Sequence, residues 1–262
     1  MLPVHNFSYG LLTPGLGYVM SVLGCFLGLR CTTRARVLSG LARLRWLLLA
    51  AVSIGVTGVW VMHFIAMLGF TIPGETITYN VPVTIFSAVV AVLFVAGGLL
   101  IVGFRGDGRQ QLLLGGLIIG LGVASMHYIG MTAMRMPAMV HYNSFLVFVS
   151  VLIAVLAGTA ALWAGLHLRG LWSTLGASLI MGVAVSGMHY TGMAAMEVFP
   201  GQSAGMMPGA SATAFLFPLL IGISVLTVVL AMVVAVSPTD EEIQADAALN
   251  AQVAALDESR GA

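Results

Sequence analysis

The stretch MHYIGMTAM, residues 126–134, has two counterparts in the chain: MHFIAM begins at Met62 and MHYTGMAAM at Met188. The starting points are 64 and 62 residues apart, so each copy belongs to a unit of similar length. All three copies lie in apolar runs of the length that an α-helix needs to cross a bilayer, roughly 20 residues. A histidine in hydrocarbon costs free energy unless something there binds it. The repeat therefore sets the architecture and also raises the question of function.

The composition is that of an integral membrane protein. Of the 262 residues, 60% are hydrophobic and 7% are charged, whereas a soluble domain carries about 25% charged residues. The mean hydropathy is +1.06. All basic residues are arginine, which excludes a retinal pigment because retinal needs a lysine Schiff base. The net charge of +1 gives no indication of nucleic-acid binding.

Seven apolar runs are long enough to span a membrane. They cover residues 9–29, 46–70, 81–104, 111–134, 144–166, 171–197 and 213–236. Connections rich in proline and glycine between them indicate turns. The motifs fall in the second, fourth and sixth runs, so the repeating unit is a helix pair of constant orientation. The predicted fold is an all-α membrane protein with seven transmembrane helices, three parallel two-helix repeats plus one extra helix. Such repeats pack about an axis along the membrane normal, and we expect the motif helices to converge.

Arginines predict the orientation. They concentrate around the first, third and fifth connections, while Arg135 is the one basic residue in the other three. The positive-inside rule then places the N-terminus outside and the C-terminus in the cytoplasm of a bacterial cell, with the helices in the cytoplasmic (inner) membrane. Residues 1–236 form the membrane domain. Residues 237–262 are predicted as a short acidic cytoplasmic tail, and Ser237 as N-cap with Pro238 at the first helical position indicates a helix. Its weak apolar stripe leaves open a solvated tail, a linker or a homodimer contact.

The three motif histidines are the first candidates for metal ligands. Each lies roughly 15 to 18 residues into its helix, which at about 1.5 Å per residue puts all three at one level in the outer half of the membrane. The methionine four residues later lies on the same helix face. Neutral imidazole with thioether favours copper, Cu(I) especially, and brings no charge into the membrane. The candidate ligands are His63, Met67, His127, Met131, His189 and Met193.

Five more methionines are secondary metal candidates. Met62, Met126 and Met188 each precede a histidine and lie about 100° round the helix, so packing is their first expected role. Met134 and Met196 continue the stripe outward, where the first copy has a phenylalanine. A lone buried histidine with neighbouring methionines more often makes a helix-to-helix hydrogen bond than a metal site. Three equivalent copies at one depth favour the metal.

These motifs on alternate helices of a seven-helix chain resemble the bacterial MHYT sensor domain, over residues 5–236. The resemblance implies copper bound through the motif methionines and histidines near the outer face. It also implies sensing of oxygen, carbon monoxide or nitric oxide through that copper. Family members are often joined to cytoplasmic cyclase or phosphodiesterase output domains, which makes a cytoplasmic signalling partner an expectation here. The first copy departs from the pattern, with Phe64 in place of tyrosine.

The leading hypothesis is a copper-dependent membrane sensor of a diatomic gas or of redox state, not an enzyme, that signals by helix repacking. Two alternatives stay open. The methionine stripes could be an entry path for copper transport or delivery, although the helices carry mostly small and apolar residues deeper than the histidines. Two of the imidazoles could instead be axial ligands of haem.

Overall fold

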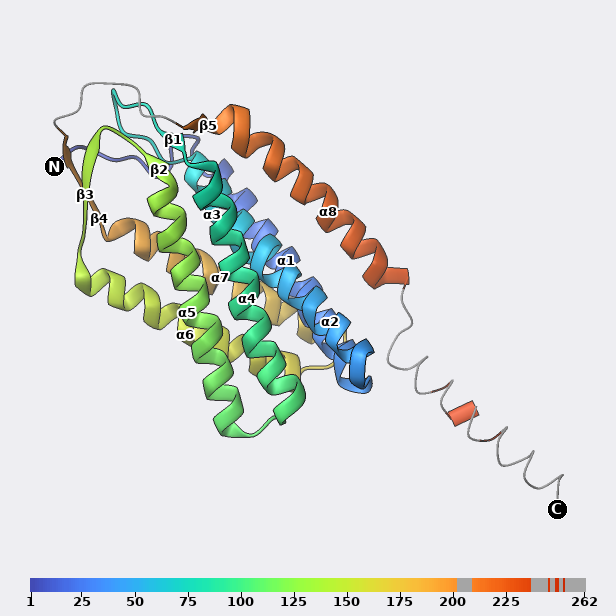
Figure 1. The fold of residues 1–262 in the computed structure, drawn as a ribbon. Helices are drawn as coiled ribbons and strands as arrows, with labels where there is room; N and C mark the ends of the chain where they lie inside the picture. The colour runs from blue at the N-terminus through green and yellow to red at the C-terminus, as the bar shows by residue number, and fades with distance from the viewer. Residues whose placement is uncertain (202–208, 237–244, 246–247, 250–251, 253–262) are drawn as a thin grey trace, which may run out of the picture.

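The computed structural model describes residues 1–201 and 209–236, together with residues 245, 248, 249 and 252. The predicted tail of residues 237–262 thus falls, apart from four positions, outside the described residues. In the described part, seven helical spans are long and apolar enough to cross a membrane, as predicted. The spans are α1 (Leu12–Val37), a continuous α2 (Gly40–Val52), η1 (Ser53–Val61) and α3 (Met62–Leu68), α4 (Val81–Arg105), α5 (Arg109–Ala133), α6 (Ser144–His167), α7 (Leu171–Ala194), and η2 (Ala212–Leu216) with α8 (Phe217–Val236) (Figure 1).

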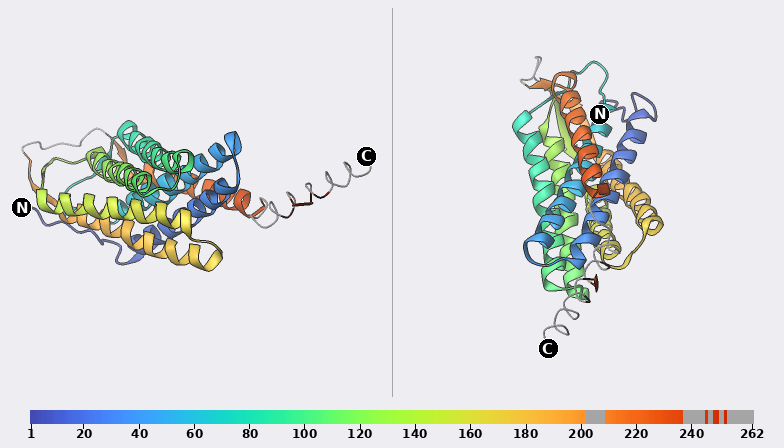
Figure 2. Two further views of the ribbon diagram at one scale, coloured as in Figure 1. Left: turned by 90° about the horizontal axis from the view of Figure 1, so that it is seen from below. Right: turned by 90° about the vertical axis from the view of Figure 1, so that its right-hand side faces the viewer.

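The three helix pairs form a closed ring. Going round it, α1 packs against the α2–η1–α3 span, α2 against α4, α4 against α5, α5 against α6, α6 against α7, and α7 against α1. Within the ring, α7 also contacts α3 and α5, and α5 contacts η1. The extra helix α8 lies outside the ring against η1 and α1 (Figure 2). The motif helices therefore converge at the centre, as three parallel repeats about one axis would place them.

One backbone hydrogen bond per pair displays the repeat in the structure. In each pair, the carbonyl six residues after the histidine accepts an N–H from a residue just before the pair's first helix. The three bonds run from Ser8 to Gly69 (3.0 Å), from Asn80 to Ala133 (2.8 Å) and from Asn143 to Ala195 (2.8 Å). The side chains of Asn80 and Asn143 also cap α4 and α6. Each motif helix is thus tied, close to its histidine, to the beginning of its partner helix.

Two small sheets cover the end of the bundle where the motif helices finish. The strand β1 (Thr78–Tyr79) pairs antiparallel with both β2 (Met134–Arg135) and β5 (Ala210–Ser211). Strand β3 (Ala138–Tyr142) pairs antiparallel with β4 (Met196–Pro200), with Met139 opposite Phe199. Turn-forming residues predict plain loops here. Strands form instead because connections from different repeats lie side by side, and their backbone groups satisfy one another.

The first connection is shorter than the arginine pattern predicts. Helix α1 runs to Val37, eight residues past the predicted end, and α2 already begins at Gly40. Arg34 is only 3% exposed, and its guanidinium carbon lies 5.0 Å from the centre of the Trp46 ring. A long side chain stacked on an aromatic ring can remain within a helix that continues through it. The predicted arginine loop is therefore mostly helix.

A π-helix precedes the first histidine. The segment η1 lies immediately before Met62, and its span has 29 residues, whereas the other spans have 24 to 26. A π-helical turn holds more residues than an α-helical turn, so it absorbs the extra length. Gly58 of η1 abuts Gly24 of α1 so closely that a Cβ on Gly24 would collide with the backbone of Gly58.

Candidate metal centre

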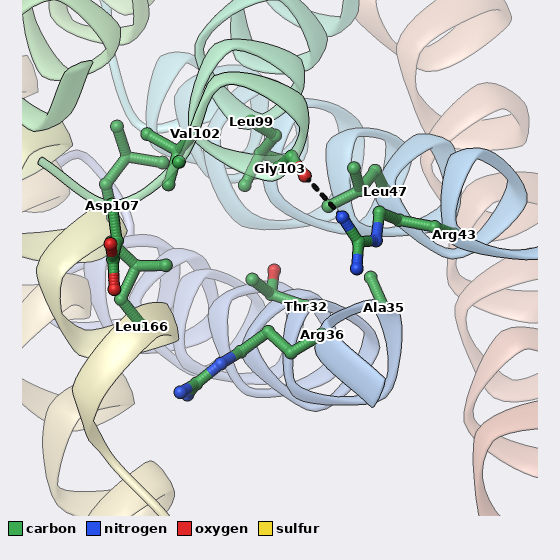
Figure 3. A pocket seen from close by; sticks show the side chains of 12 residues that line it. Thr32, Ala35, Arg36, Arg43, Leu47, Leu99, Val102, Gly103, Asp107 and Leu166 are labelled. Atoms are coloured by element: carbon green, nitrogen blue, oxygen red, sulfur yellow. Dashed lines mark hydrogen bonds between the residues drawn. The ribbon is translucent and has the colours of Figure 1, made fainter. Parts of the chain in front are cut away.

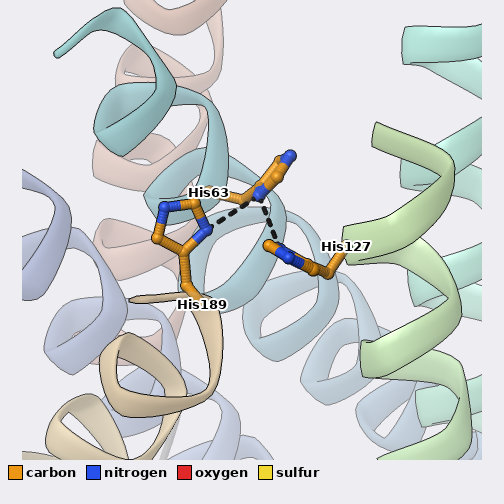
Figure 4. Close-up of side chains that lie close together, drawn as sticks. All are labelled: His63, His127 and His189. Atoms are coloured by element: carbon orange, nitrogen blue, oxygen red, sulfur yellow. Dashed lines mark hydrogen bonds between the residues drawn. The ribbon is translucent and has the colours of Figure 1, made fainter. Parts of the chain in front are cut away.

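His63, His127 and His189 meet at the centre of the ring, as predicted. They come from α3, α5 and α7, are fully buried, and offer ligand atoms that all lie within 4.8 Å of one another. The Nδ1 atom of His63 lies 3.0 Å from Nδ1 of His189 and 3.1 Å from Nδ1 of His127 (Figure 4). The rings meet edge to face, with centroids 4.9 to 5.1 Å apart. Three helices thus bring three equivalent nitrogens to one point.

The centre lies inside the bundle, close to the end that carries the sheets. Each histidine is five or six residues from the end of its helix, which is about 8–9 Å at 1.5 Å per residue. On the side away from the sheets there is a cavity of only about 30 Å³, lined by Val59, Val123, Val185, Met188 and other small or apolar residues. The histidines are therefore closed off from that end by hydrocarbon.

Each of two histidine rings rests on a glycine of the next motif. A Cβ added at Gly130 would lie 2.5 Å from Nε2 of His63, and one added at Gly192 would collide with Nε2 of His127. Both glycines stand three residues after their own histidine, where the first copy has Ala66. Sequence reasoning missed this role, although the glycine is visible in MHYIGM and MHYTGM. The seating follows the order of the motifs, since the first histidine rests on the second motif and the second on the third.

Neutral imidazoles cannot satisfy this arrangement by themselves. Each carries one N–H and one nitrogen lone pair, and the buried Nε2 atoms of His63 and His127 have no hydrogen-bond partner within the described residues. A proton on Nε2 of His63 is therefore unpaired. If His63 is instead protonated on Nδ1, two cases arise. When His127 is also protonated on Nδ1, the two N–H groups point at each other. When His127 is protonated on Nε2, that N–H has no partner.

A cation fits the centre better than protons do. With a cation among the three Nδ1 atoms, all three nitrogens present lone pairs to it and the conflict between them disappears. The Nε2–H groups of His63 and His127 then lie against glycine, a cost that coordination to a metal readily offsets, since such binding is worth about 10–16 kcal/mol at structural zinc sites. The three histidines can thus hold a metal ion; their geometry alone is common to several metals.

The motif methionines are buried around this centre. Met67, Met131 and Met193 are 1–3% exposed, and the three methionines that precede the histidines are equally buried, at 1–2%. Burial shows that these side chains belong to the core of the ring. Ligation of a metal by any of the six sulfurs stays a prediction.

A methionine-lined cavity lies where α5 ends, among residues of strands β2, β3 and β4. It has a volume of about 330 Å³, and its walls include Met131, Met134, Met136 and Met196. The two outward methionines predicted as secondary candidates therefore share one cavity with the methionine one turn beyond His127. Met136 escaped the sequence reasoning because it follows the end of α5, where helical spacing no longer applies.

The second motif's tyrosine, Tyr128, bonds to a neighbouring helix through its hydroxyl, while its ring lies 4.8 Å from that of His127 between centroids. The hydroxyl of Tyr128 shares a 2.7 Å hydrogen bond with Ser150 of the neighbouring helix α6. Its ring also packs edge to face on that of Tyr142 in β3, at 5.7 Å between centroids. The tyrosine of the motif therefore packs the pair together, which explains how the first copy can have Phe64 in its place.

Comparison with known proteins connects this architecture to bacterial signalling. The family model MHYT, described as "Bacterial signalling protein N terminal repeat", matches residues 57–115 and 120–178. The bifunctional diguanylate cyclase/cyclic di-GMP phosphodiesterase MucR of Pseudomonas aeruginosa is 34% identical over 87% of this chain and 34% of its own length. The cyclic di-GMP phosphodiesterase NbdA of the same organism is 35% identical over 74% of this chain and 25% of its own length.

A third relative comes from a distant bacterium. The signaling protein YkoW of Bacillus subtilis is 29% identical over 69% of this chain and 23% of its own length. The chain thus spans about a third or less of the length of the curated relatives that it matches. No solved structure is detectably similar to the chain.

Proposed function

We propose that this chain, which belongs to the MHYT family of bacterial membrane signalling proteins, is a sensor that binds copper through His63, His127 and His189. The observation that carries the proposal is the convergence of three buried imidazoles whose ligand atoms lie close enough to share one cation. Copper is the metal that neutral imidazoles with nearby thioethers prefer. Met67, Met131 and Met193 would supply those thioethers. Bound copper would supply a redox couple and a binding position for oxygen, carbon monoxide or nitric oxide.

The signal would leave through helix α8. The hydroxyl of Thr57, in the π-helix before His63, shares a 3.0 Å hydrogen bond with that of Thr227 in α8. Only 22% of the most apolar stretch of α8 is buried, so this helix is the span least held by its neighbours. A change at His63 that alters the π-helical turns would therefore bias the position of α8.

The direction of signalling follows from the arginines. The connections with most of the arginines lie at the end of the bundle opposite the sheets. By the positive-inside rule, that end and the end of α8 would face the cytoplasm. A cytoplasmic signalling partner or output domain would receive the signal there. Relatives named for cyclic di-GMP synthesis and hydrolysis support such an output.

Two other functions fit the geometry less well. Copper transport needs a way out beyond the histidines, and the small cavity on that side is lined by side chains such as Val59 and Val185. Haem with two histidine ligands needs the porphyrin between the two rings, whereas each pair of rings here is in edge-to-face contact.

The test of the metal site is copper stoichiometry in purified full-length chain. Replacing His63, His127 and His189 by alanine, singly and together, should abolish copper binding in the triple variant and weaken it in each single variant. His141→Ala is the matched control, because His141 is exposed on β3 and should leave copper content unchanged. Circular dichroism checks that each variant keeps its helices. Unchanged copper in a folded triple variant would sink the ligand assignment.

The sensing step needs its own test. Copper-loaded protein should change its optical or paramagnetic spectrum on reduction, or on addition of oxygen, carbon monoxide or nitric oxide, and the triple histidine variant should show no such change. A copper-loaded protein that responds to none of these treatments would refute the sensor while leaving the metal site intact.

A further inference from the structure

A second polar site lies at the end of the bundle opposite the sheets. A pocket of about 220 Å³ opens there between α1, α2, α4 and α6. Its charged side chains Arg36, Arg43 and Asp107 lie around a space that is otherwise mostly apolar (Figure 3). Two guanidinium groups, one carboxylate and several leucines line it, among them Arg36, Arg43, Asp107, Leu47, Leu99 and Leu166. The pocket is far along the chain from every motif histidine and plays no part in the metal centre.

The side chains of the two arginines donate hydrogen bonds to backbone carbonyls at or near the ends of helices. Arg43 donates from Nε to the carbonyl of Leu38 at 2.7 Å and from Nη1 to that of Gly103, near the end of α4, at 2.9 Å. Arg36 donates from Nη1 to the carbonyl of Gly165, near the end of α6, at 3.3 Å. A guanidinium carries five N–H donors in one plane, so these two bonds leave further donors of Arg43 for a ligand. Capping of helix ends accounts for these hydrogen bonds from Arg36 and Arg43. It does not account for the pocket that the two arginines line.

We propose that this pocket binds the headgroup of a membrane phospholipid, with the phosphate between Arg36 and Arg43. Arginine suits phosphate because its planar donors match the oxygens. Basic pockets between transmembrane helices at the cytoplasmic side are typical positions for lipid headgroups. The volume of about 220 Å³ is below the roughly 300–1,000 Å³ of pockets that enclose whole small-molecule ligands. A headgroup with the first atoms of its glycerol is a ligand of suitable size.

The carboxylate selects among phospholipids. Asp107 lines the same pocket as the two arginines and is exposed. It would repel a purely anionic ligand and attract a positive group. Phosphatidylethanolamine carries a phosphate for the arginines and an ammonium for Asp107, and its acyl chains begin where the leucines lie. Inorganic phosphate would use neither the leucines nor Asp107. The assigned ligand is therefore a zwitterionic phospholipid, and this assignment is independent of the copper proposal.

The test is lipid binding to the delipidated full chain, followed by native mass spectrometry. The chain should bind phosphatidylethanolamine more tightly than phosphatidylglycerol. Arg36→Gln and Arg43→Gln should each weaken both lipids by about tenfold, because each removes a charge-assisted hydrogen bond. Asp107→Asn should shift the preference toward phosphatidylglycerol by about fivefold. Arg45→Gln is the matched control, since Arg45 is exposed on α2 outside the pocket.

Separate arms distinguish the sources of phosphate. Inorganic phosphate should not displace the lipid at concentrations that match the lipid; displacement would identify a free-anion site and overturn the proposal. Equal losses in Arg45→Gln, or unchanged lipid affinity in Arg36→Gln, would also overturn it. If Arg43→Gln fails to fold, Arg36→Gln decides, because Arg36 has the longer bond to its helix end. Tighter binding of phosphatidylglycerol by the unaltered chain would refute the role of Asp107 and with it the choice of lipid.

Discussion

Gly130→Ala should damage the metal centre without replacing any proposed ligand. The added methyl would lie 2.5 Å from Nε2 and 3.0 Å from Cδ2 of His63. Ordinary van der Waals contact begins at 3.4 Å, so the first distance is about 0.9 Å too short. The imidazole is rigid, and a push on Nε2 therefore moves Nδ1 as well. His63 is the ring that contacts both others through Nδ1, so its displacement disturbs the whole cluster.

The size of the effect follows from the tolerance of metal coordination. Ligand distances in metal sites hold to about ±0.2 Å, and a displacement several times larger exceeds that unless α5 moves away. Changes in groups that orient a ligand typically cost 10- to 100-fold in metal affinity. We therefore expect copper affinity to fall by about 10- to 100-fold, or roughly 1.4–2.7 kcal/mol. Overpacking in a close-packed core should also destabilise the fold by about 1–3 kcal/mol.

The assay is competitive titration of Cu(I) against a chelator of known affinity, with thermal unfolding measured in parallel. Gly187→Ala is the matched control, because it lies on α7 two residues before His189 and an added Cβ there meets nothing within 4 Å. It should leave copper affinity unchanged. The reasoning fails if folded Gly130→Ala binds copper as tightly as the unaltered chain, or if Gly187→Ala loses as much affinity.

Two further predictions concern α8 and the sheets. Thr227→Val removes the hydrogen bond with Thr57. It should leave copper binding intact but abolish the copper-dependent movement of α8, measured by spin-label distances between α8 and α1. Unchanged movement would rule out this route. Burial, with a contribution from nearby Tyr128, raises the pKa of Tyr142 from 10.0 to about 12. Between pH 10 and 12 this tyrosine loses its proton in the unfolded chain but keeps it in the folded one, so the free energy of unfolding should fall as pH rises. Thermal unfolding at alkaline pH should show a smaller fall in Tyr142→Phe, and an identical pH profile in the two proteins would contradict this.

The helices and the meeting of the histidines could be predicted because each depends on a local or repeated signal. Apolar length defines the spans, and the recurrence of the motif at 64 and 62 residues fixes the pairing of helices. Similar units packed about an axis put equivalent residues at one depth, and those on the inward face of each motif helix meet at the centre. His63, His127 and His189 were therefore identifiable before any coordinates.

Other features depend on contacts that no local pattern carries. The π-helix of Ser53–Val61 contains Gly58, which lies against Gly24 of α1, and that contact is a property of the assembled pair. The strands exist because connections from different repeats meet. The seating of His63 on Gly130 joins the first motif to the second, and periodicity within one helix says nothing about which neighbour it faces. The predicted loop around Arg34 failed because stacking on Trp46 lets the helix continue.

The departures from threefold symmetry concentrate in the first repeat, and they indicate how a symmetric centre can drive a single output. The second and third motifs are continuous α-helices with a glycine under the neighbouring ring, whereas the first is preceded by a π-helix and has Ala66 at the glycine position. Helix α8 packs against this same repeat, on η1 and α1. Three equal ligands alone would hold a metal without preferring any direction. A change at the centre would displace most readily the helix whose turns are irregular, because π-helical turns can be rearranged without breaking the span. The irregular first repeat therefore both contributes His63 and contacts α8, the helix through which we propose that the signal leaves.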